Sequence, residues 1–243
     1  DIEPIINKYK SKDNDFYRIE KTINYSSNEP LLLNYRGIDH SSSANESNLT
    51  KIVNDLGITT GSGVTELYNH GSTIIADSLL GLKYVIAHDN IEGTTMNLEY
   101  TKNKYYNLVE KIDGFNIYEN PYNLPIGFMV NKEIENINSN NINLFDFQRD
   151  ILNSMITKTE KQEYYTRFYE SNIKLNNVKK DSFEGSNRYT KIDKNNDGFI
   201  EINLKAPNED ILYMYLPCEL FGSEKLKVSN TIHIYINGEK YTA

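Results

Sequence analysis

The most suggestive chemistry in this sequence lies in the stretch DKNNDGFIE, at residues 193–201. A helix-flanked calcium loop places oxygen ligands at its positions 1, 3 and 5, glycine at position 6 and a bidentate glutamate at position 12. Asp193, Asn195 and Asp197 match the first half of this pattern. Position 12 is Leu204, which has no side-chain oxygen. The motif therefore lacks the ligand on which tight calcium binding depends.

The residues on both sides of this loop alternate between apolar and polar side chains, as β-strands do. The sequence therefore predicts that residues 193–198 form the tip of a β-hairpin, which binds calcium weakly or not at all. An isolated metal site in a loop between strands is the alternative interpretation. Its ligands would be Asp193, Asn195, Asp197 and Glu201.

A second chemically interesting stretch is RGIDHSSSANES, at residues 36–47. Its serine and asparagine side chains are expected to cap a helix that begins near Glu46. The free N–H groups and the dipole of a helix N-terminus attract anions. An ordinary capping loop is the competing interpretation. The predicted anion-binding residues are Arg36, His40, Ser42 and Ser43.

The other reactive residue types form no recognisable site. The single cysteine, Cys218, cannot make an internal disulfide, and we interpret it as a buried side chain. No two histidines share a local spacing suited to metal binding, and His40 and His70 each lie in a polar loop. The sequence contains no phosphate-binding loop, dinucleotide fingerprint or nucleophile elbow. We therefore predict no cofactor and no self-evident catalytic centre.

Composition limits the classes of partner. The formal net charge of −8 argues against nucleic acid, because neutralising phosphates needs a basic surface. No stretch approaches the roughly 18 apolar residues of a membrane span, so the chain as given is predicted to be soluble. It begins at Asp1 rather than at methionine, which suggests a processed protein or a piece excised from a larger one.

The first 130 residues mix helix and strand patterns without strict alternation, which predicts an α+β domain. Leu49, Ile52, Val53 and Leu56 recur at helical spacing before Gly57. The expected elements are a strand at 15–23, helices at 46–56 and 72–80, a strand at 83–89, a hairpin around 113–114 and a strand at 124–130.

Residues 131–143 are polar and rich in asparagine, and are the predicted linker. A helix is expected at 144–155. From Glu163 onward short alternating segments predict an antiparallel β-sandwich. Tyrosine-rich strands of this kind can stack on sugars, although they are more often ordinary sheet faces. The predicted organisation is an α+β domain at 1–135, followed by a helix plus β-sandwich domain at 136–243.

The order of these segments resembles the extracytoplasmic part of YfhO-type bacterial membrane proteins. The most specific piece is DSLLGLKYVI, followed some thirty residues later by YEN and LPIGF. Together the matching stretches span nearly the whole chain. They are FYRIE at 16–20, NYRGIDHSSS at 34–43, GSTIIADSLLGLKYVIA at 71–87, IYENPYNLPIGFMV at 117–130, LFDFQRDILNSM at 144–155, ILYMYLP at 211–217 and YINGE at 235–239.

The resemblance implies a polytopic protein with a GT-C-like membrane core in a Gram-positive cell envelope. Such glycosyltransferases take a sugar from an undecaprenyl-phosphate carrier and attach it to an envelope polymer such as lipoteichoic acid. The implied catalytic acid lies in an extracytoplasmic loop between membrane helices, so none is assigned in this sequence. The sandwich of the family is expected to continue past the C-terminus of this chain, so the second domain is predicted to be truncated.

The resulting functional hypothesis is an extracytoplasmic domain that binds the acceptor polymer or has a structural role. The predicted partners are an envelope glycopolymer and a lipid-linked sugar held by the membrane part. Arg36, His40, Ser42 and Ser43 are the predicted acceptor-binding residues. The alternatives are a stand-alone extracellular carbohydrate- or protein-binding module and a soluble hydrolase with scattered catalytic residues.

Overall fold

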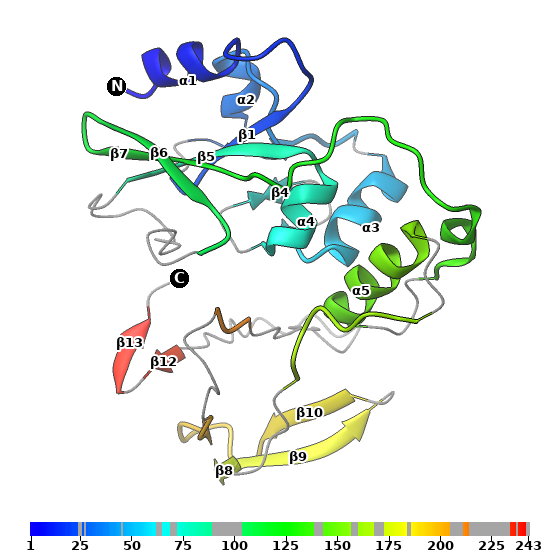
Figure 1. Cartoon of the computed structure of the whole chain (residues 1–243). Coiled ribbons are helices and arrows are strands. Elements are labelled where there is room, and N and C mark those ends of the chain that lie inside the picture. Colours follow the sequence, from blue (N-terminus) through cyan, green and yellow to red (C-terminus); the bar gives the residue numbers. More distant parts are fainter. Residues whose placement is uncertain are drawn as a thin grey trace.

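The structure of the chain is a computed structural model, which contains both helices and strands (Figure 1). The described residues are 1–23, 26, 28–44, 46–61, 65–68, 72–88, 104–138, 143–156, 160–167, 173–183, 186–204, 211–213, 234–236 and 238–241.

A mixed four-stranded sheet forms the centre of the fold. Its strand order is β1 (Arg18–Lys21), β5 (Leu82–His88), β7 (Phe115–Glu119) and β6 (Asn107–Ile112). β1 runs parallel to β5, whereas β7 is antiparallel to both of its neighbours. Apolar runs make β5 and β7 buried strands, as expected for strands covered on both faces.

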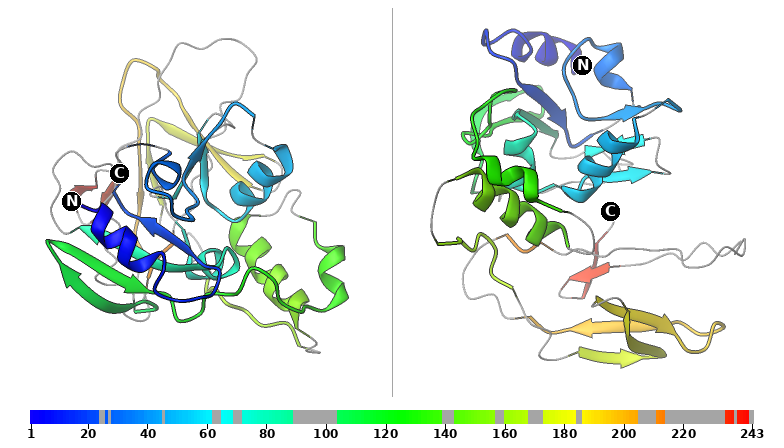
Figure 2. Two further views of the ribbon diagram at one scale, coloured as in Figure 1. Left: turned by 90° about the horizontal axis from the view of Figure 1, so that it is seen from above. Right: turned by 90° about the vertical axis from the view of Figure 1, so that its right-hand side faces the viewer.

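One face of this sheet is covered by α1 (Glu3–Tyr9) and α2 (Glu29–Leu32) (Figure 2). Pro4 and Pro30 each occupy the first turn of their helix, where the missing N–H costs nothing. The core on this side consists of Ile2, Ile5, Ile6, Tyr9, Tyr17, Ile19, Ile23, Tyr35, Tyr84, Ile86, Phe115 and Ile117.

Two charged residues of β1 are buried and hold the segments that follow it. Lys21 donates to the Glu29 carboxylate at 2.6 Å, which ties α2 to the sheet. Glu20 accepts the backbone N–H groups of Ile38 and Asp39, and burial raises the pKa of Glu20 to about 8. A strand within the predicted 15–23 segment is therefore confirmed, although it spans only Arg18–Lys21 and both of its faces are buried.

The opposite face carries α3 (Ser47–Asp55) and α4 (Ile74–Leu79), with α5 (Leu144–Met155) packed against them. A small antiparallel sheet lies beside these helices. Its order is β2 (His40–Ser41), β4 (Thr65–Leu67) and β3 (Thr59–Gly61). The core on this side consists of Val53, Leu56, Ile58, Tyr68, Ala76, Leu82, Val85, Ala87, Tyr106, Tyr118, Phe147 and Ile151.

The predicted helices, the two strands at 15–23 and 83–89 and the 113–114 hairpin are confirmed. Asp113 and Gly114 have φ of 50° and 82°, the left-handed values that a tight two-residue turn requires. The strand expected at 124–130 is wrong, because this segment forms a loop with exposed apolar side chains. The predicted linker contains the 3₁₀-helix η3 (Lys132–Asn136).

The C-terminal strands pair only in twos within the part of the chain that the structure describes. Leu175, Phe199 and Ile200 are at least 39% exposed, so these ladders bury little apolar surface. The predicted β-sandwich is therefore not confirmed. The pairs are β8 (Ile173–Asn176) with β11 (Phe199–Ile202), β9 (Val178–Phe183) with β10 (Ser186–Lys191), and β12 (Ile234–Ile236) with β13 (Glu239–Tyr241).

The DKNNDG stretch is not a hairpin tip, so that prediction is wrong. β10 and β11 on either side of it pair with β9 and β8, and the reversal lies where Phe183 meets Ser186. Residues 193–198 instead form a bulge opposite Asn177, whose φ is 52°. The Asn177 side chain accepts from the Asp193 N–H at 2.8 Å and donates to the Asp193 carbonyl at 2.9 Å.

The division of the chain at residues 135 and 136 stays a prediction. Phe147 and Ile151 of α5, which that division assigns to the second domain, pack against Leu56 and Ala76 of the first. In Figure 2 the ladders of β8 to β11 lie at the end of the molecule opposite α1 and α2.

We expect Asn177→Ala to lower the free energy of unfolding of the β8–β11 ladder by about 1–3 kcal/mol. The substitution removes the hydrogen bonds to the bulge, and alanine tolerates positive φ less well than asparagine does. Hydrogen exchange of the ladder amides measures this loss. Asn177→Gly is the matched control, because glycine accepts positive φ and loses only the hydrogen bonds. Equal protection in wild type and Asn177→Ala would contradict the assignment.

Candidate functional site

Arg36 and His40, the two charged or titratable residues predicted to bind an anion, have different surroundings. Arg36 is exposed, and its guanidinium lies 4.6 Å from the centroid of the Phe16 ring. Its carbonyl accepts the Ile19 N–H at 2.9 Å, which fixes the backbone beside β1. His40 begins β2 and pairs with Glu66 of β4. Neither of these contacts joins Arg36 to His40.

The N-terminus of α3 is capped by a glutamate rather than by the predicted serine or asparagine. The Glu46 carboxylate accepts the Leu49 N–H at 2.8 Å. Ser42 accepts the Ala44 N–H at 3.1 Å, and Ser43 is exposed. Because the chain's own carboxylate already meets the helix dipole, this end of α3 is less attractive to an external anion. The acceptor-binding role of the four predicted residues stays a prediction.

Two acidic side chains of the 193–201 stretch, those of Asp193 and Glu201, are engaged with protein donors. Asp193 accepts the Asn195 N–H at 2.9 Å, and this bond is the main reason that the pKa of Asp193 is lowered. Glu201 pairs with Lys174 across the ladder at 2.9 Å. Among the described residues, no group of three or more His, Cys, Asp and Glu side chains is arranged to hold a metal ion.

Two of the remaining reactive residues, His70 and Cys218, lie outside the described residues. His88 is described, and its ring packs edge-on against Phe115 with centroids 4.8 Å apart. His88 therefore forms part of the sheet packing.

Asp77 of α4 is a buried carboxylate on the face of the sheet that carries α3 and α4, and its pKa is raised. Its side chain is held by three hydroxyl donors while the residue is only 1% exposed. Ser72 donates at 2.6 Å, Tyr68 at 3.0 Å, and Tyr106 donates as well. Burial raises the pKa of Asp77 to about 6, although the three hydrogen bonds oppose this shift.

Gln148 of α5 links the N-terminus of α4, which carries Asp77, to the half-buried Tyr165. It is fully buried, and its amide donates to the Leu56 carbonyl at 2.7 Å. Its carbonyl oxygen accepts the hydroxyl of Thr73, the N-cap of α4, at 2.7 Å. The same oxygen accepts the hydroxyl of Tyr165. A single amide therefore fixes α3, α4, α5 and Tyr165 relative to one another.

Tyr165 belongs to a cluster of three half-buried aromatic rings that we call the aromatic cluster: Phe145, Tyr165 and Tyr213. The ring centroids of Phe145 and Tyr165 are 5.1 Å apart, and those of Tyr165 and Tyr213 are 6.1 Å apart. Burial raises the pKa of Tyr165 to about 12, so its hydroxyl remains a donor at neutral pH. The Tyr165 ring is thus held both by the neighbouring rings and, through its hydroxyl, by the buried Gln148.

Charged side chains border the aromatic cluster. Asp146 of α5 accepts from Arg149 at 2.8 Å and from Arg167. Arg149 also pairs with Asp150 at 2.9 Å. Aromatic faces beside fixed planar donors and carboxylate acceptors match the chemistry of sugars, which have apolar C–H faces and a rim of hydroxyls.

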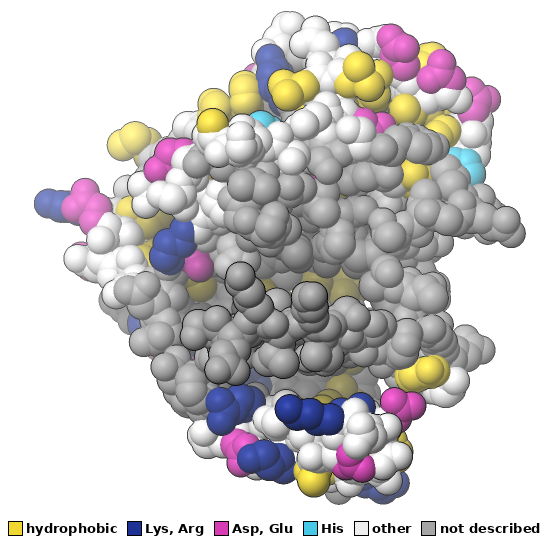
Figure 3. All heavy atoms as spheres, turned by 180° about the vertical axis from the view of Figure 1, so that it is seen from behind, with side chains coloured by type: hydrophobic (Ala, Val, Ile, Leu, Met, Phe, Trp, Pro, Cys, Tyr) yellow, Lys and Arg dark blue, Asp and Glu magenta, His cyan; other side chains and the backbone are white. Residues whose placement is uncertain are grey.

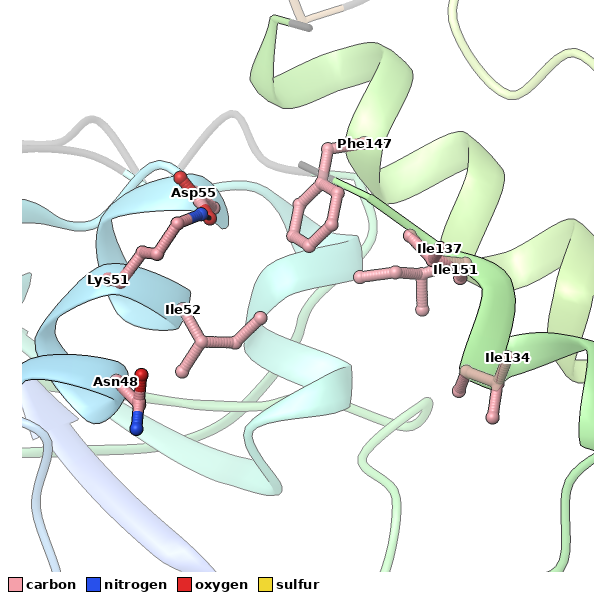
Figure 4. Close-up of a pocket in the computed structure, with 8 residues that line it drawn as sticks. All are labelled: Asn48, Lys51, Ile52, Asp55, Ile134, Ile137, Phe147 and Ile151. Carbon is pink, nitrogen blue, oxygen red and sulfur yellow. Dashed lines mark hydrogen bonds and ion pairs between the residues drawn. The ribbon is translucent and has the colours of Figure 1, made fainter. Parts of the chain in front are cut away.

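A separate groove of about 310 Å³ lies between α3, η3 and α5 (Figure 4). Its walls are mainly apolar, with Ile52, Phe147 and Ile151 pointing toward one another. The Lys51–Asp55 ion pair lies at its rim and satisfies both charges. This groove offers few polar partners to a glycan, so we place the candidate site at the aromatic cluster.

The comparisons with known proteins identify the family. The family described as bacterial membrane protein YfhO matches residues 1–243. The chain belongs to this family. The resemblance predicted from the sequence is thereby confirmed. No curated protein and no solved structure matches the chain.

The helices and the surface charge of this YfhO-family chain bear on what it can contact. In the described part of the chain, none of the helices has both the length and the apolar character needed to cross a bilayer. Viewed from behind, the lower part of the molecule shows basic and acidic side chains interspersed (Figure 3). A surface of mixed sign does not by itself favour an anionic polymer.

Sequence reasoning missed the aromatic cluster in this YfhO-family chain. Phe145 appeared only as part of a helix, and Tyr165 and Tyr213 only as members of alternating segments. The available signal was the density of tyrosines at 164–169 and 211–215. That signal alone does not tell which rings meet, because Phe145 and Tyr213 are far apart in the sequence.

We expect the Asp77 carboxyl to make stability depend on pH. Its pKa rises from 3.8 to about 6 on folding, so the folded state favours the protonated form. This contribution is fully present below pH 3.8 and is lost as the pH rises through about 6. The difference in unfolding free energy between wild type and Asp77→Asn should therefore fall across this window and stay constant above it.

Denaturant melts at a series of pH values measure this difference. Glu20, whose pKa is also raised, is present in both proteins and cancels. A difference that rises with pH, or that does not vary between pH 3.8 and 6, would contradict the buried state of Asp77.

Proposed function

We propose that this chain is an extracytoplasmic part of a polytopic membrane glycosyltransferase and that it binds the acceptor polymer. The parent enzyme would use a polyprenyl-phosphate-linked sugar to modify an envelope polymer such as lipoteichoic acid. Membership of a bacterial membrane protein family supports the membrane context. The enzymatic role, the extracytoplasmic face and the substrates belong to the proposal.

The aromatic cluster is the observation that carries the acceptor-binding role. Stacking on a sugar needs rings that are accessible on one face and already ordered, because ordering flexible side chains costs free energy on binding. Tyr165 meets this need, since its ring is half-buried and its hydroxyl is held by Gln148. Arg149 and Arg167 beside it can meet the phosphates of a teichoic acid, although both are already paired with Asp146.

Sugar transfer itself is assigned to the membrane-embedded part of the parent. A polyprenyl carrier keeps its tail in the bilayer, so its phosphate lies at the membrane surface. An acid or base must reach the acceptor hydroxyl within hydrogen-bond distance of that point. The resemblance places this group in a loop between membrane helices, and we assign it to no residue of this chain.

The proposal also includes three features that the sequence predicts. They are the C-terminal β-sandwich, the domain boundary at 135 and 136, and the anion contacts of the 36–43 segment. A stand-alone carbohydrate-binding module uses the same aromatic cluster and differs only in lacking an attached enzyme.

We expect Tyr165→Ala to weaken binding of partly glycosylated lipoteichoic acid, which can still accept sugar, roughly 2- to 12-fold, which corresponds to the loss of about 0.5–1.5 kcal/mol of ring stacking. Tyr165→Phe should weaken binding less than Tyr165→Ala does, because the ring remains but is no longer held by Gln148. Titration calorimetry with the purified chain measures both.

Tyr164→Ala is the matched control, because Tyr164 is a neighbouring tyrosine that is 40% exposed and lies outside the aromatic cluster. A double Arg36→Ala and His40→Ala variant tests the alternative anion contacts in the same assay. Unchanged binding by Tyr165→Ala, together with weakened binding by the double variant, would move the acceptor site to the 36–43 segment.

A further inference from the structure

The loop between β7 and η3 carries four exposed apolar side chains, among them Met129, which has the highest exposed fraction of the large hydrophobic residues that the structure describes. Met129 is 97% exposed, Ile126 is 69% exposed and Tyr122 is 58% exposed. Phe128 is 40% exposed. Placing these side chains in water is unfavourable, and several exposed apolar side chains on one short loop indicate an interaction site.

The same loop has no charge along its length. No Asp, Glu, Lys or Arg lies between Glu119 and Lys132, although a quarter of the chain is charged. A protein partner for such a loop would have to offer an apolar pocket. A bilayer interface accepts uncharged apolar side chains without any specific shape, and it favours tyrosine at the level of the headgroups.

Both ends of the loop are fixed to the folded body. Asn120 donates to the Leu82 carbonyl at 3.0 Å, and the Leu124 N–H donates to the Ser78 carbonyl at 3.0 Å. At the other end the Asn131 N–H donates to the Met155 carbonyl at 3.2 Å. Figure 1 shows the segment as the green arc that joins β7 to η3 at the outer edge of the molecule. The apolar side chains are therefore displayed on a supported loop.

We propose that residues 122–130 insert into the interface of the phospholipid bilayer beside which this membrane-protein family resides. Ile126, Phe128 and Met129 enter the acyl boundary, and Tyr122 lies at the headgroups. The inference rests on family membership and on the loop, and it does not depend on sugar transfer.

The absence of tryptophan from the chain allows a direct test. In Met129→Trp the new indole is the sole tryptophan, so its emission reports the environment of position 129 alone. With vesicles of phosphatidylcholine we expect a blue shift and quenching by bromine-labelled acyl chains. Zwitterionic lipid is chosen because the net charge of −8 repels anionic vesicles.

Ile192→Trp is the matched control, because Ile192 is 65% exposed and directly follows β10 at the opposite end of the molecule. Its emission should not respond to lipid. Adding Ile126→Asp to Met129→Trp should lower the partition coefficient about tenfold, since a charge replaces an inserted apolar side chain. Unchanged thermal melting would verify that Ile126→Asp folds.

Three outcomes would overturn the proposal. They are an emission of Met129→Trp that ignores lipid, an equal response from Ile192→Trp, and a shift that follows protein concentration without vesicles. The last of these would identify a second copy of the chain as the occupant. None of them would affect the proposed acceptor binding, which is measured at Tyr165 in the absence of vesicles.

Discussion

The burial of the Asp77 carboxylate is the constraint on which the arrangement of this molecule depends. A buried carboxylate without donors costs several kcal/mol, so the three hydroxyls that satisfy it must stay in place. They come from Ser72, Tyr68 and Tyr106, which lie before α4, after β4 and before β6. Asp77 therefore fixes α4 against both the small sheet and the edge of the central sheet.

Two surfaces of different chemistry extend from α4. At its N-terminus Thr73 bonds to Gln148, which in turn holds the hydroxyl of Tyr165 in the aromatic cluster. Near its C-terminus the Ser78 carbonyl accepts the Leu124 N–H and so supports the apolar loop. If both proposals hold, this short helix sets the distance between the acceptor surface and the bilayer. Activity at the membrane would then depend on a polar core that touches neither ligand.

Local patterns predicted those elements whose burial follows from their own sequence. The Asp113-Gly114 turn is an example, and α5 was predicted to the residue, whereas the period of two at 15–23 predicted the strand but not the burial of both its faces. The apolar run at 124–130 predicts a strand but forms a loop, because period and composition do not tell whether an apolar segment is buried or exposed. The bulge at 193–198 depends on Asn177, which pairs with it only after β8 and β11 meet. The aromatic cluster likewise depends on contacts between residues that are distant in the sequence, and a local pattern cannot reveal such contacts.

We propose a division of labour in which this chain binds the acceptor and the membrane-embedded part of the parent transfers the sugar. The most direct measurement compares the full-length parent with the chain of residues 1–243 in detergent. Both are supplied with an undecaprenyl-phosphate sugar and lipoteichoic acid, and incorporation of the sugar is followed over time. The account predicts transfer by the full-length protein and none by the chain alone. Transfer by the chain alone at a rate comparable to that of the parent would contradict it.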